Sequence, residues 1–429
     1  MDKHSAPRRR SAARKTARHG AVRYLGVLLT AAVAVLCLGL LPRFLPGQIP
    51  VGGTEPPESE AAPSQEAASS VPEPQPVVET VRFSATGDNL IHSPIYKQAA
   101  RRASGGTERY SFDYCYQDIV PFYALQDVNW INQETLCSDE LEPSTYPCFS
   151  TPGDCARALY RAGVRVFSLS NNHTYDKGAT GIGATLRFWE SMPEDVVTTG
   201  LWKGEADYGR IPLQTVNGVT IAYLSYTEHT NGIPRSSAMP ANIIYTSQTD
   251  VIQQQVQAAR QLADFVVVGV HWGVEDSHTI VDSQRTLAQQ LADWGADVVL
   301  GTHPHVLQNA QWLAAADGRS CFVAYSLGNF LSTQSKPDQL VGAILTLQLQ
   351  KTTEPDGTVH CALLEPKLHP TVTHYDAGKS NVRTYLFPNY TQELAAQHGV
   401  REKYSDFSLD SIRKITQNNI SEEFLDLSL

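Results

Sequence analysis

Basic residues are scarce in this sequence beyond its first 23 positions. Residues 1–23 contain eight of the 34 Lys and Arg residues and one Asp, a net charge of +7, so the remaining residues carry −17 of the total charge of −10. Phosphate backbones are bound by clustered Lys and Arg. The main part of the chain is therefore expected to have no nucleic-acid partner.

Three sequence patterns are also missing, and each absence excludes a class of protein. No segment repeats with a fixed period, so a solenoid or propeller is not expected. There is no serine nucleophile elbow and no Gly-rich nucleotide loop. What the chain does have is 42% hydrophobic and 9% aromatic residues, enough for one large domain or two smaller ones.

One long apolar run follows the basic head of residues 1–23. Residues 24–41, "YLGVLLTAAVAVLCLGLL", are 18 positions without a charge, close to the length of a membrane-spanning helix. The preceding arginines favour a cytoplasmic N-terminus. A cleaved signal peptide is the alternative, but no small-x-small cleavage site precedes Pro42. We expect a single-pass signal anchor in the cell membrane, a transmembrane helix with the C-terminal domain extracytoplasmic.

Residues 42–79 have the composition of a linker. They are rich in Pro, Glu, Ser and Ala and contain few residues that could be buried. Such a segment is expected to be disordered, extended and solvated, because it cannot form a core. We interpret it as a plain spacer that holds the folded part away from the membrane.

Predicted helices and strands alternate over residues 80–378. The segment "VIQQQVQAARQLADFVVVGVHWG" predicts a helix and then a strand over 265–270, and "TLAQQLADWGADVVLGTHPH" predicts a helix that ends near Gly295 before another strand. These strands are apolar throughout, which is typical of a sheet covered on both faces. The turn Asn217-Gly218 predicts a hairpin. The sequence therefore predicts an α/β domain with mixed sheets.

Residues that bind metals or transfer protons follow the predicted strands. Ligands gather at the carboxyl ends of strands in such sheets. The residues in question are Asp88, Glu134, Asn172, His173, His271, His303 and His305. Any one of them could be a turn, cap or core residue, but so many at one rim indicate a shared site. His229 and His278 lie in less regular loops and are not expected to belong to it.

Six motifs in chain order carry a resemblance to a known family. They are "TGDNLIH", "NQET", "SLSNNHTYDKG", "VGVHWGVED", "ADVVLGTHPHVLQ" and "YSLGNF". Over residues 82–345 the sequence resembles the bacterial capsule-synthesis protein CapA family, associated with poly-γ-glutamate capsules, whose domain is similar to the calcineurin-like metallophosphoesterases. The resemblance implies an αββα sandwich of two mixed β-sheets flanked by helices.

The resemblance also implies a role for each candidate residue. The implied metal ligands are Asp88, Glu134, Asn172, His271, His303 and His305, and the implied catalytic proton donor is His173. The cofactor would be one or two divalent metals, and carboxylate, amide and imidazole ligands suit Mn, Fe or Zn better than Ca or Mg.

Two positions depart from the phosphoesterase pattern. Leu90 stands where the Asp-x-His motif requires His, and Glu134 stands where phosphoesterases have Asp. His92 could compensate as a metal ligand or substrate contact, or it could be a first-turn helix residue. One of two metal positions could therefore be weak or empty.

Two functions are consistent with the resemblance. The first is a metal-dependent hydrolase, in which metal-assisted hydrolysis or transfer acts on a phosphoester or a capsule polymer. The alternative is a non-catalytic surface protein that handles an anionic capsule polymer such as poly-γ-glutamate, with a structural or vestigial metal site. Capsule-synthesis membrane proteins are expected partners in both cases. The charge of −17 disfavours simple tight binding of a polyanion unless cations bridge the like charges.

Cysteines and the C-terminal segment give weaker signals. Cys115, Cys137, Cys148 and Cys155 lie within 41 residues, so at least one disulfide is expected outside the cytoplasm, with the pairing open. Residues 379–429 contain helix-like stretches and are interpreted as a C-terminal extension of unknown role.

Overall fold

The computed structural model describes residues 74–103 and 108–428. The expected basic head, signal anchor and most of the expected linker lie outside these residues. None of the helices within the described ranges combines the length and apolar character needed to cross a bilayer.

Within the described residues the larger sheet has eight strands. In spatial order they are β16 (Ser380–Leu386), β15 (Val359–Asp376), β14 (Val341–Thr353), β1 (Val77–Asn89), β2 (Val128–Gln133), β5 (Val166–Ser168) and β6 (Val197–Thr199), with β13 (Asn329–Leu331) also paired to β1. Strands β1, β2, β5 and β6 run parallel, and β14, β15 and β16 are antiparallel. The carboxyl ends of the four parallel strands therefore lie along the same edge of the sheet.

The smaller sheet repeats this plan. Its six strands within the described residues are β11 (Leu307–Ala314), β12 (Ser320–Leu327), β10 (Val298–Thr302), β9 (Phe265–His271), β8 (Val219–Thr227) and β7 (Leu213–Val216). The four central strands are parallel and the two edge strands antiparallel. Asn217 and Gly218 join β7 to β8 with φ values of 48° and 80°, as a tight hairpin turn requires. The predicted hairpin is confirmed.

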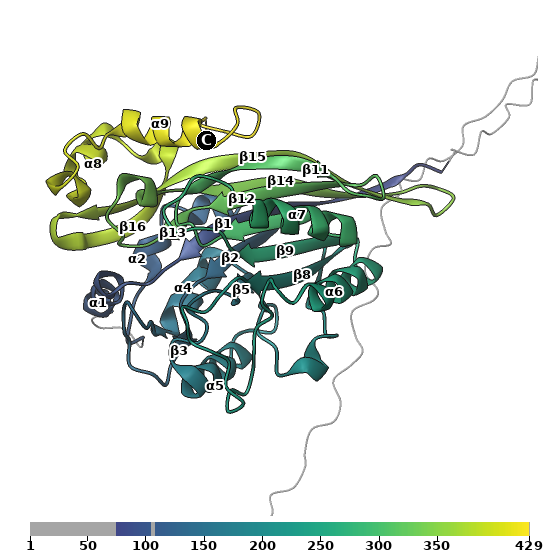
Figure 1. Cartoon of the computed structure of the whole chain (residues 1–429). Coiled ribbons are helices and arrows are strands. Elements are labelled where there is room, and N and C mark those ends of the chain that lie inside the picture. The colour runs from purple at the N-terminus through teal and green to yellow at the C-terminus, as the bar shows by residue number, and fades with distance from the viewer. Residues whose placement is uncertain (1–73, 104–107, 429) are drawn as a thin grey trace, which may run out of the picture. The chain divides into compact units, whose positions relative to one another are not determined.

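Helices cover the outer faces of both sheets (Figure 1). The longer helices are α1 (Ser93–Arg102), α4 (Asp154–Ala162), α5 (Gly178–Glu190), α6 (Thr249–Leu262), α7 (Asp282–Trp294) and α9 (Leu409–Asn419). The shorter elements are α2 (Asp113–Tyr116), α3 (Val120–Tyr123), α8 (Gln392–Gln397) and a two-stranded ribbon of β3 (Cys137–Ser138) and β4 (Thr151–Pro152). Helices α6 and α7 share a core with the smaller sheet, and α1 and α4 share one with the larger sheet. The predicted αββα sandwich of two mixed sheets is confirmed.

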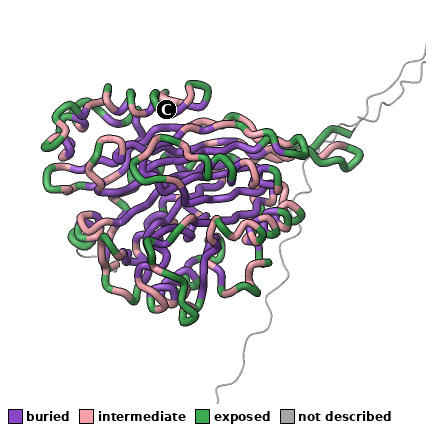
Figure 2. The backbone as a smooth tube through the Cα atoms, in the orientation of Figure 1, coloured by how far each residue is buried: buried purple, intermediate pink, exposed green. Residues whose placement is uncertain are grey.

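The two sheets pack through alternating side chains. On β9, Val267 belongs to the core between the sheets, whereas Val266 and Val268 face the helices. Both faces are buried, which explains why the strand is apolar throughout. At Gly269 an added Cβ would lie 2.8 Å from the Trp130 ring of the other sheet, so glycine permits this close approach. Figure 2 shows that burial runs through both sheets.

Two helices end at a glycine, and the end at Gly295 matches the sequence prediction. Helix α4 ends before Gly163, which has φ of 111°, and α7 ends before Gly295, which has φ of 130°. Glycine adopts this left-handed backbone without a Cβ clash and lets the last carbonyls of the helix be capped. These ends fix where β5 and β10 begin, and so where their polar strand ends lie.

The C-terminal segment belongs to the same core as the main domain. Strand β16 pairs with β15, and the Phe424 ring lies edge-on to Phe322 with centroids 5.2 Å apart. Val382 and Ile412 are fully buried in the core that also contains β1. The fold therefore continues without interruption past residue 378.

The expectation of a disulfide among the clustered cysteines is wrong for the described residues. The six described cysteines are all free, and Cys115, Cys137 and Cys155 are buried. Burial raises the pKa of the Cys155 thiol to about 12, and the thiol contacts the Tyr116 hydroxyl at 3.3 Å. These thiols act as small core residues, which is a common use of free cysteine.

Candidate metal centre

Polar residues from both sheets converge at the carboxyl ends of the parallel strands. Asp88 lies at the end of β1 and Glu134 follows β2, while Asn172 and His173 follow β5. From the smaller sheet, His271 ends β9, and His303 and His305 follow β10. All seven are buried. This convergence is the site that the sequence places at the strand ends.

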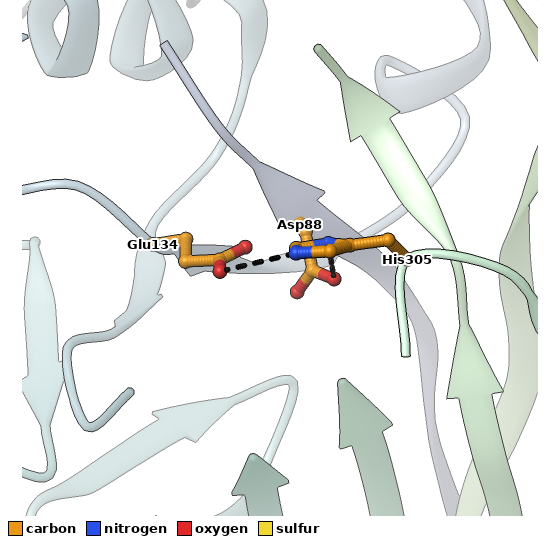
Figure 3. Close-up of side chains that lie close together, drawn as sticks. All are labelled: Asp88, Glu134 and His305. Carbon is orange, nitrogen blue, oxygen red and sulfur yellow. Dashed lines mark hydrogen bonds and ion pairs between the residues drawn. The ribbon is translucent and has the colours of Figure 1, made fainter. Parts of the chain in front are cut away.

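Asp88, Glu134 and His305 form one half of the centre (Figure 3). The Nδ1 atom of His305 lies 3.0 Å from Asp88 Oδ2, and its Nε2 atom lies 3.7 Å from Glu134 Oε1. Asn132 donates from Nδ2 to Asp88 Oδ1 at 2.8 Å, which fixes the carboxylate from its other side. One imidazole thus lies between two carboxylates in a dry interior.

His271, Asn172 and His303 form the other half. His271 Nε2 lies 3.1 Å from Asn172 Oδ1 and 3.1 Å from His303 Nδ1. The same nitrogen is 3.7 Å from Glu134 Oε1, which joins the two halves. His271 Nδ1 faces the Thr302 hydroxyl at 3.0 Å. Metal-binding histidines are commonly oriented in this way by a partner on the second nitrogen.

The loop that carries His303 and His305 has an unusual backbone. Their φ values are 98° and 59°, a left-handed region that non-glycine residues seldom adopt. Such backbone costs of the order of 1–3 kcal/mol and is concentrated at functional sites. The His303 amide donates to Asp88 Oδ2 at 3.3 Å, and Asn329 Nδ2 donates to the His305 carbonyl at 3.3 Å. These bonds hold both rings toward the centre.

Burial controls the protonation of the first half. It raises the pKa of Glu134 well above its usual value, and the negative charge of Asp88 raises it further. For His305 burial acts in the opposite direction, but Glu134 and the hydrogen bond to Asp88 prevail and raise its pKa to about 10. Without a cation, protons therefore balance the negative charge of this half.

The imidazoles of the second half are neutral. Burial lowers the pKa of His271 well below its usual value, and the neighbouring His303 and His305 lower it further. Burial and the adjacent imidazoles lower the pKa of His303 to about 2. Neutral imidazole is the form that binds metals.

The donor set fits a divalent cation. Neither carboxylate oxygen of Glu134 has a hydrogen-bond partner, although both are buried, and Asn132 Oδ1 is also unpaired. Unpaired buried polar atoms are rare and require an explanation such as a bound ion. Carboxylate, amide and imidazole donors within this small volume suit a borderline transition metal. Metal binding by these residues stays a prediction that the geometry supports.

His173 lies beside this donor set and is held by Asp176. Its Nδ1 atom is 2.8 Å from Asp176 Oδ2, and that oxygen also accepts the Phe149 amide at 2.6 Å. The Phe149 ring lies edge-on to the imidazole at 4.7 Å. A proton on Nδ1 donates to Asp176 and leaves Nε2 as the atom that is free to act.

His92 lies outside the group of donor atoms. Its Nδ1 is 3.2 Å from the Leu90 carbonyl and 3.3 Å from the Thr333 amide. It occupies the N-cap position of α1 without a side-chain capping hydrogen bond, and burial lowers its pKa to about 3. Its ring lies edge-on to Phe149 at 5.3 Å. Of the two alternatives for His92, this environment favours a residue at the start of a helix over a metal ligand.

Asn132, in the strand-end group Asn132-Gln133-Glu134 that the sequence also indicates, contacts Asp88. Sequence reasoning missed Asp176, which contacts His173 and lies within a quoted motif, so its spacing offered a signal. His229 was expected to lie apart, and this expectation is wrong, because its Nε2 is 3.3 Å from His303 Nε2. His278 does lie apart, at 2.7 Å from the Leu307 carbonyl and 3.1 Å from Asp338.

Comparisons with known sequences agree with the motifs. Residues 82–334, which include every candidate ligand, match the family described as bacterial capsule synthesis protein PGA_cap. The chain is 30% identical over 249 residues to the PGA biosynthesis protein CapA of Bacillus subtilis (strain 168), covering 57% of this chain and 63% of that protein. It is 31% identical over 236 residues to the capsule biosynthesis protein CapA of Bacillus anthracis, covering 53% and 55%. The matches thus span less than two thirds of either relative.

Solved structures with similar folds are distant. The NAD nucleotidase NadN of Haemophilus influenzae aligns with 12% identity and a TM-score of 0.38, covering 82% of this chain and 64% of that one. A putative 5′-nucleotidase of Staphylococcus aureus aligns with 13% identity and a TM-score of 0.37, covering 66% and 54%.

Proposed function

This chain belongs to the bacterial capsule synthesis protein PGA_cap family, and from that premise we propose that it is a metal-dependent hydrolase or transferase of capsule synthesis. The observation that carries the chemical part is Glu134, whose two buried oxygens lack hydrogen bonds and whose Oε1 lies 3.7 Å from both His271 Nε2 and His305 Nε2. A buried carboxyl group that is surrounded by imidazoles and makes no hydrogen bond is an expected feature of a metal site.

The donor residues divide the work of holding a cation. His305 with Asp88 and Glu134 would bind on one side, and Asn172 with His271 and His303 on the other. When bound, Mn, Fe or Zn supplies a Lewis acid that activates water and offsets charge on a phosphoryl or carbonyl oxygen. Leu90 is an apolar residue where the phosphoesterase pattern has a His ligand, so the first side would rest on Asp88, Glu134 and His305.

His173 is the proposed general acid. Asp176 holds Nδ1, so Nε2 can give a proton to the departing oxygen of a substrate and be reprotonated from solvent. Phe149 contacts both partners of this dyad, through its amide and its ring, and limits the positions that the imidazole can adopt. The same arrangement would serve phosphoester or amide bonds.

The substrate and location are further parts of the proposal. A capsule polymer or a phosphoester linked to its synthesis is the proposed substrate class, and an N-terminal anchor would place the domain outside the cell membrane. The acidic domain would need cations to approach an anionic polymer. Protease added to intact cells should then remove the domain and leave residues 1–23 protected. Mature protein that starts after about residue 40 would contradict the anchor.

The test of the chemistry is a metal analysis combined with a hydrolysis screen. Full-length protein, loaded with Mn or Zn, is incubated with phosphomonoesters, phosphodiesters and poly-γ-glutamate, and the Asn172→Ala variant serves as the matched control. Turnover that depends on the metal and is lost in the variant supports the enzyme. If the protein binds stoichiometric metal and the polymer but shows no turnover, the enzyme function is refuted and the non-catalytic assembly role takes its place. Absence of metal would refute both forms of the site.

A further inference from the structure

The loop after β8 brings two side chains onto the histidines of the centre. His229 reaches His303, with 3.3 Å between the two Nε2 atoms and ring centroids 4.9 Å apart. Two positions later, Asn231 Nδ2 lies 3.4 Å from His173 Nδ1. Both loop residues are exposed, whereas the histidines that they contact are buried. The loop thus reaches the buried centre from the solvent side.

His303 has one nitrogen toward the proposed metal donors, Nδ1, and one away from them, Nε2. The partner of Nε2 is His229. His303 Nδ1 faces His271 Nε2 at 3.1 Å, so Nδ1 is the atom that can offer a lone pair to a cation. The proton of the neutral ring must then be on Nε2 and needs an acceptor. His229 Nε2 lies 3.3 Å away and accepts this proton in the tautomer of His229 that carries its own proton on Nδ1, the nitrogen that lies 3.4 Å from the Asn231 backbone amide. The corresponding partner of His271 is the Thr302 hydroxyl.

The backbone at His303 makes this partner more important. With φ of 98°, His303 directly follows β10 in a strained backbone conformation, and its amide donates to Asp88 Oδ2 at 3.3 Å. Its two nitrogens contact only imidazoles among the described side chains, His271 on one side and His229 on the other. Removal of His229 would free the ring to rotate and lose the Nδ1 orientation.

We propose that His229 is a positioning residue that holds His303 in the tautomer and orientation needed to bind the metal. The proposal rests on the proposed metal site. It assigns to the loop after β8 a share in metal affinity, although none of its residues is among the donors. Outer partners of metal-binding histidines typically change affinity by 10–100-fold.

The experiment measures the affinity of full-length protein for Zn and Mn by competition with a chromophoric chelator. His229→Ala should weaken affinity by about 10–100-fold. His229→Gln, whose amide oxygen can accept the same hydrogen bond, should restore most of it. The thermal midpoint of the metal-free protein should not change in either variant, because the side chain is exposed.

Asn231→Gly is the matched control. Asn231 lies in the same loop and contacts His173 instead of a donor, and glycine accepts its φ of 51°. This variant should bind metal like the wild type. Unchanged affinity in His229→Ala would overturn the proposal, as would equal losses in the Ala, Gln and Asn231 variants, which would indicate a general loop effect. A wild type that binds no metal would instead refute the proposed function.

Discussion

Asp88 Oδ2 and His305 Nδ1 lie 3.0 Å apart, although 217 positions of the chain separate them. One belongs to the first strand of the larger sheet and the other to a loop of the smaller sheet. The contact therefore exists only when both sheets are packed together. Burial opposes the charged form of His305, but Glu134 and this contact with Asp88 together raise the pKa of the imidazole to about 10.

Removal of a donor should abolish metal binding without unfolding the domain. Asn172→Ala and His303→Ala each delete one atom next to His271 Nε2, and we expect both variants to lose stoichiometric Mn or Zn. Elemental analysis after gel filtration measures this, with circular dichroism as the folding check. His278→Ala is the control, because that histidine contacts Leu307 and Asp338 away from the centre. Full metal content in both donor variants would show that the site is misplaced.

Glu134→Gln should separate stability from metal binding. Burial and Asp88 raise the pKa of Glu134 and so disfavour its charged form, and Gln is a neutral side chain of nearly the same shape. We expect the free energy of unfolding of the metal-free protein to change by less than about 1 kcal/mol.

The metal-bound state should behave differently. A cation at 100 times its Kd stabilises the wild type by about 2.7 kcal/mol, and this gain should largely disappear in the variant. Denaturant titrations with and without Zn measure both quantities. An equal gain in the two proteins would exclude Glu134 as a ligand.

Metal binding should release protons. Burial and Asp88 raise the pKa of Glu134, and Glu134 with Asp88 raises that of His305 to about 10, so this pair holds a proton near neutral pH that a bound cation would displace. Affinity should therefore fall as pH falls. Calorimetry of Zn binding at one pH in buffers of different ionisation enthalpy counts the protons. A buffer-independent enthalpy would contradict this linkage.

His173→Ala should keep the metal and slow the reaction of poor leaving groups. A general acid typically contributes 10²–10⁴-fold, so turnover of alkyl phosphoesters should fall by about that factor while nitrophenyl esters change much less. Asp176→Asn should also slow alkyl phosphoesters more than nitrophenyl esters, but by a smaller factor. It alters the hydrogen-bond partner of His173 Nδ1 and leaves the imidazole in place. Equal slowing of good and poor leaving groups would indicate a role other than proton donation.

The strand ends were the most predictable part of the molecule. Apolar runs such as 265–270 and the stop at Gly295 mark β9 and the end of α7, and a polar residue directly after a buried strand must lie at the rim. The start of β1 at Val77 is less predictable, because Val77 and Val78 are apolar but exposed and the buried part of the strand begins only at Val81. The apolar pattern of each strand therefore predicted which loop carries each candidate metal ligand.

Contacts that depend on irregular backbone were not predictable. His229 lies in a loop without periodicity, and only the packing of the two sheets brings it to His303. The free thiols were misjudged for a related reason, since closeness in sequence does not decide whether two cysteines meet in space. Ser380–Leu386 has no motif, and its place beside β15 follows from an antiparallel turn back along the sheet.

The positions of the donors along the chain have a consequence for how the protein matures. The first half of the domain supplies a carboxylate pair and an amide, and the second half supplies the imidazoles, so a nascent or partly folded chain offers a cation only fragments of the final geometry. If the centre binds a cation as proposed, selection among competing metals would depend on the finished tertiary structure, and loading would follow folding. The ion retained in a purified sample would record the compartment in which the two sheets first closed on each other.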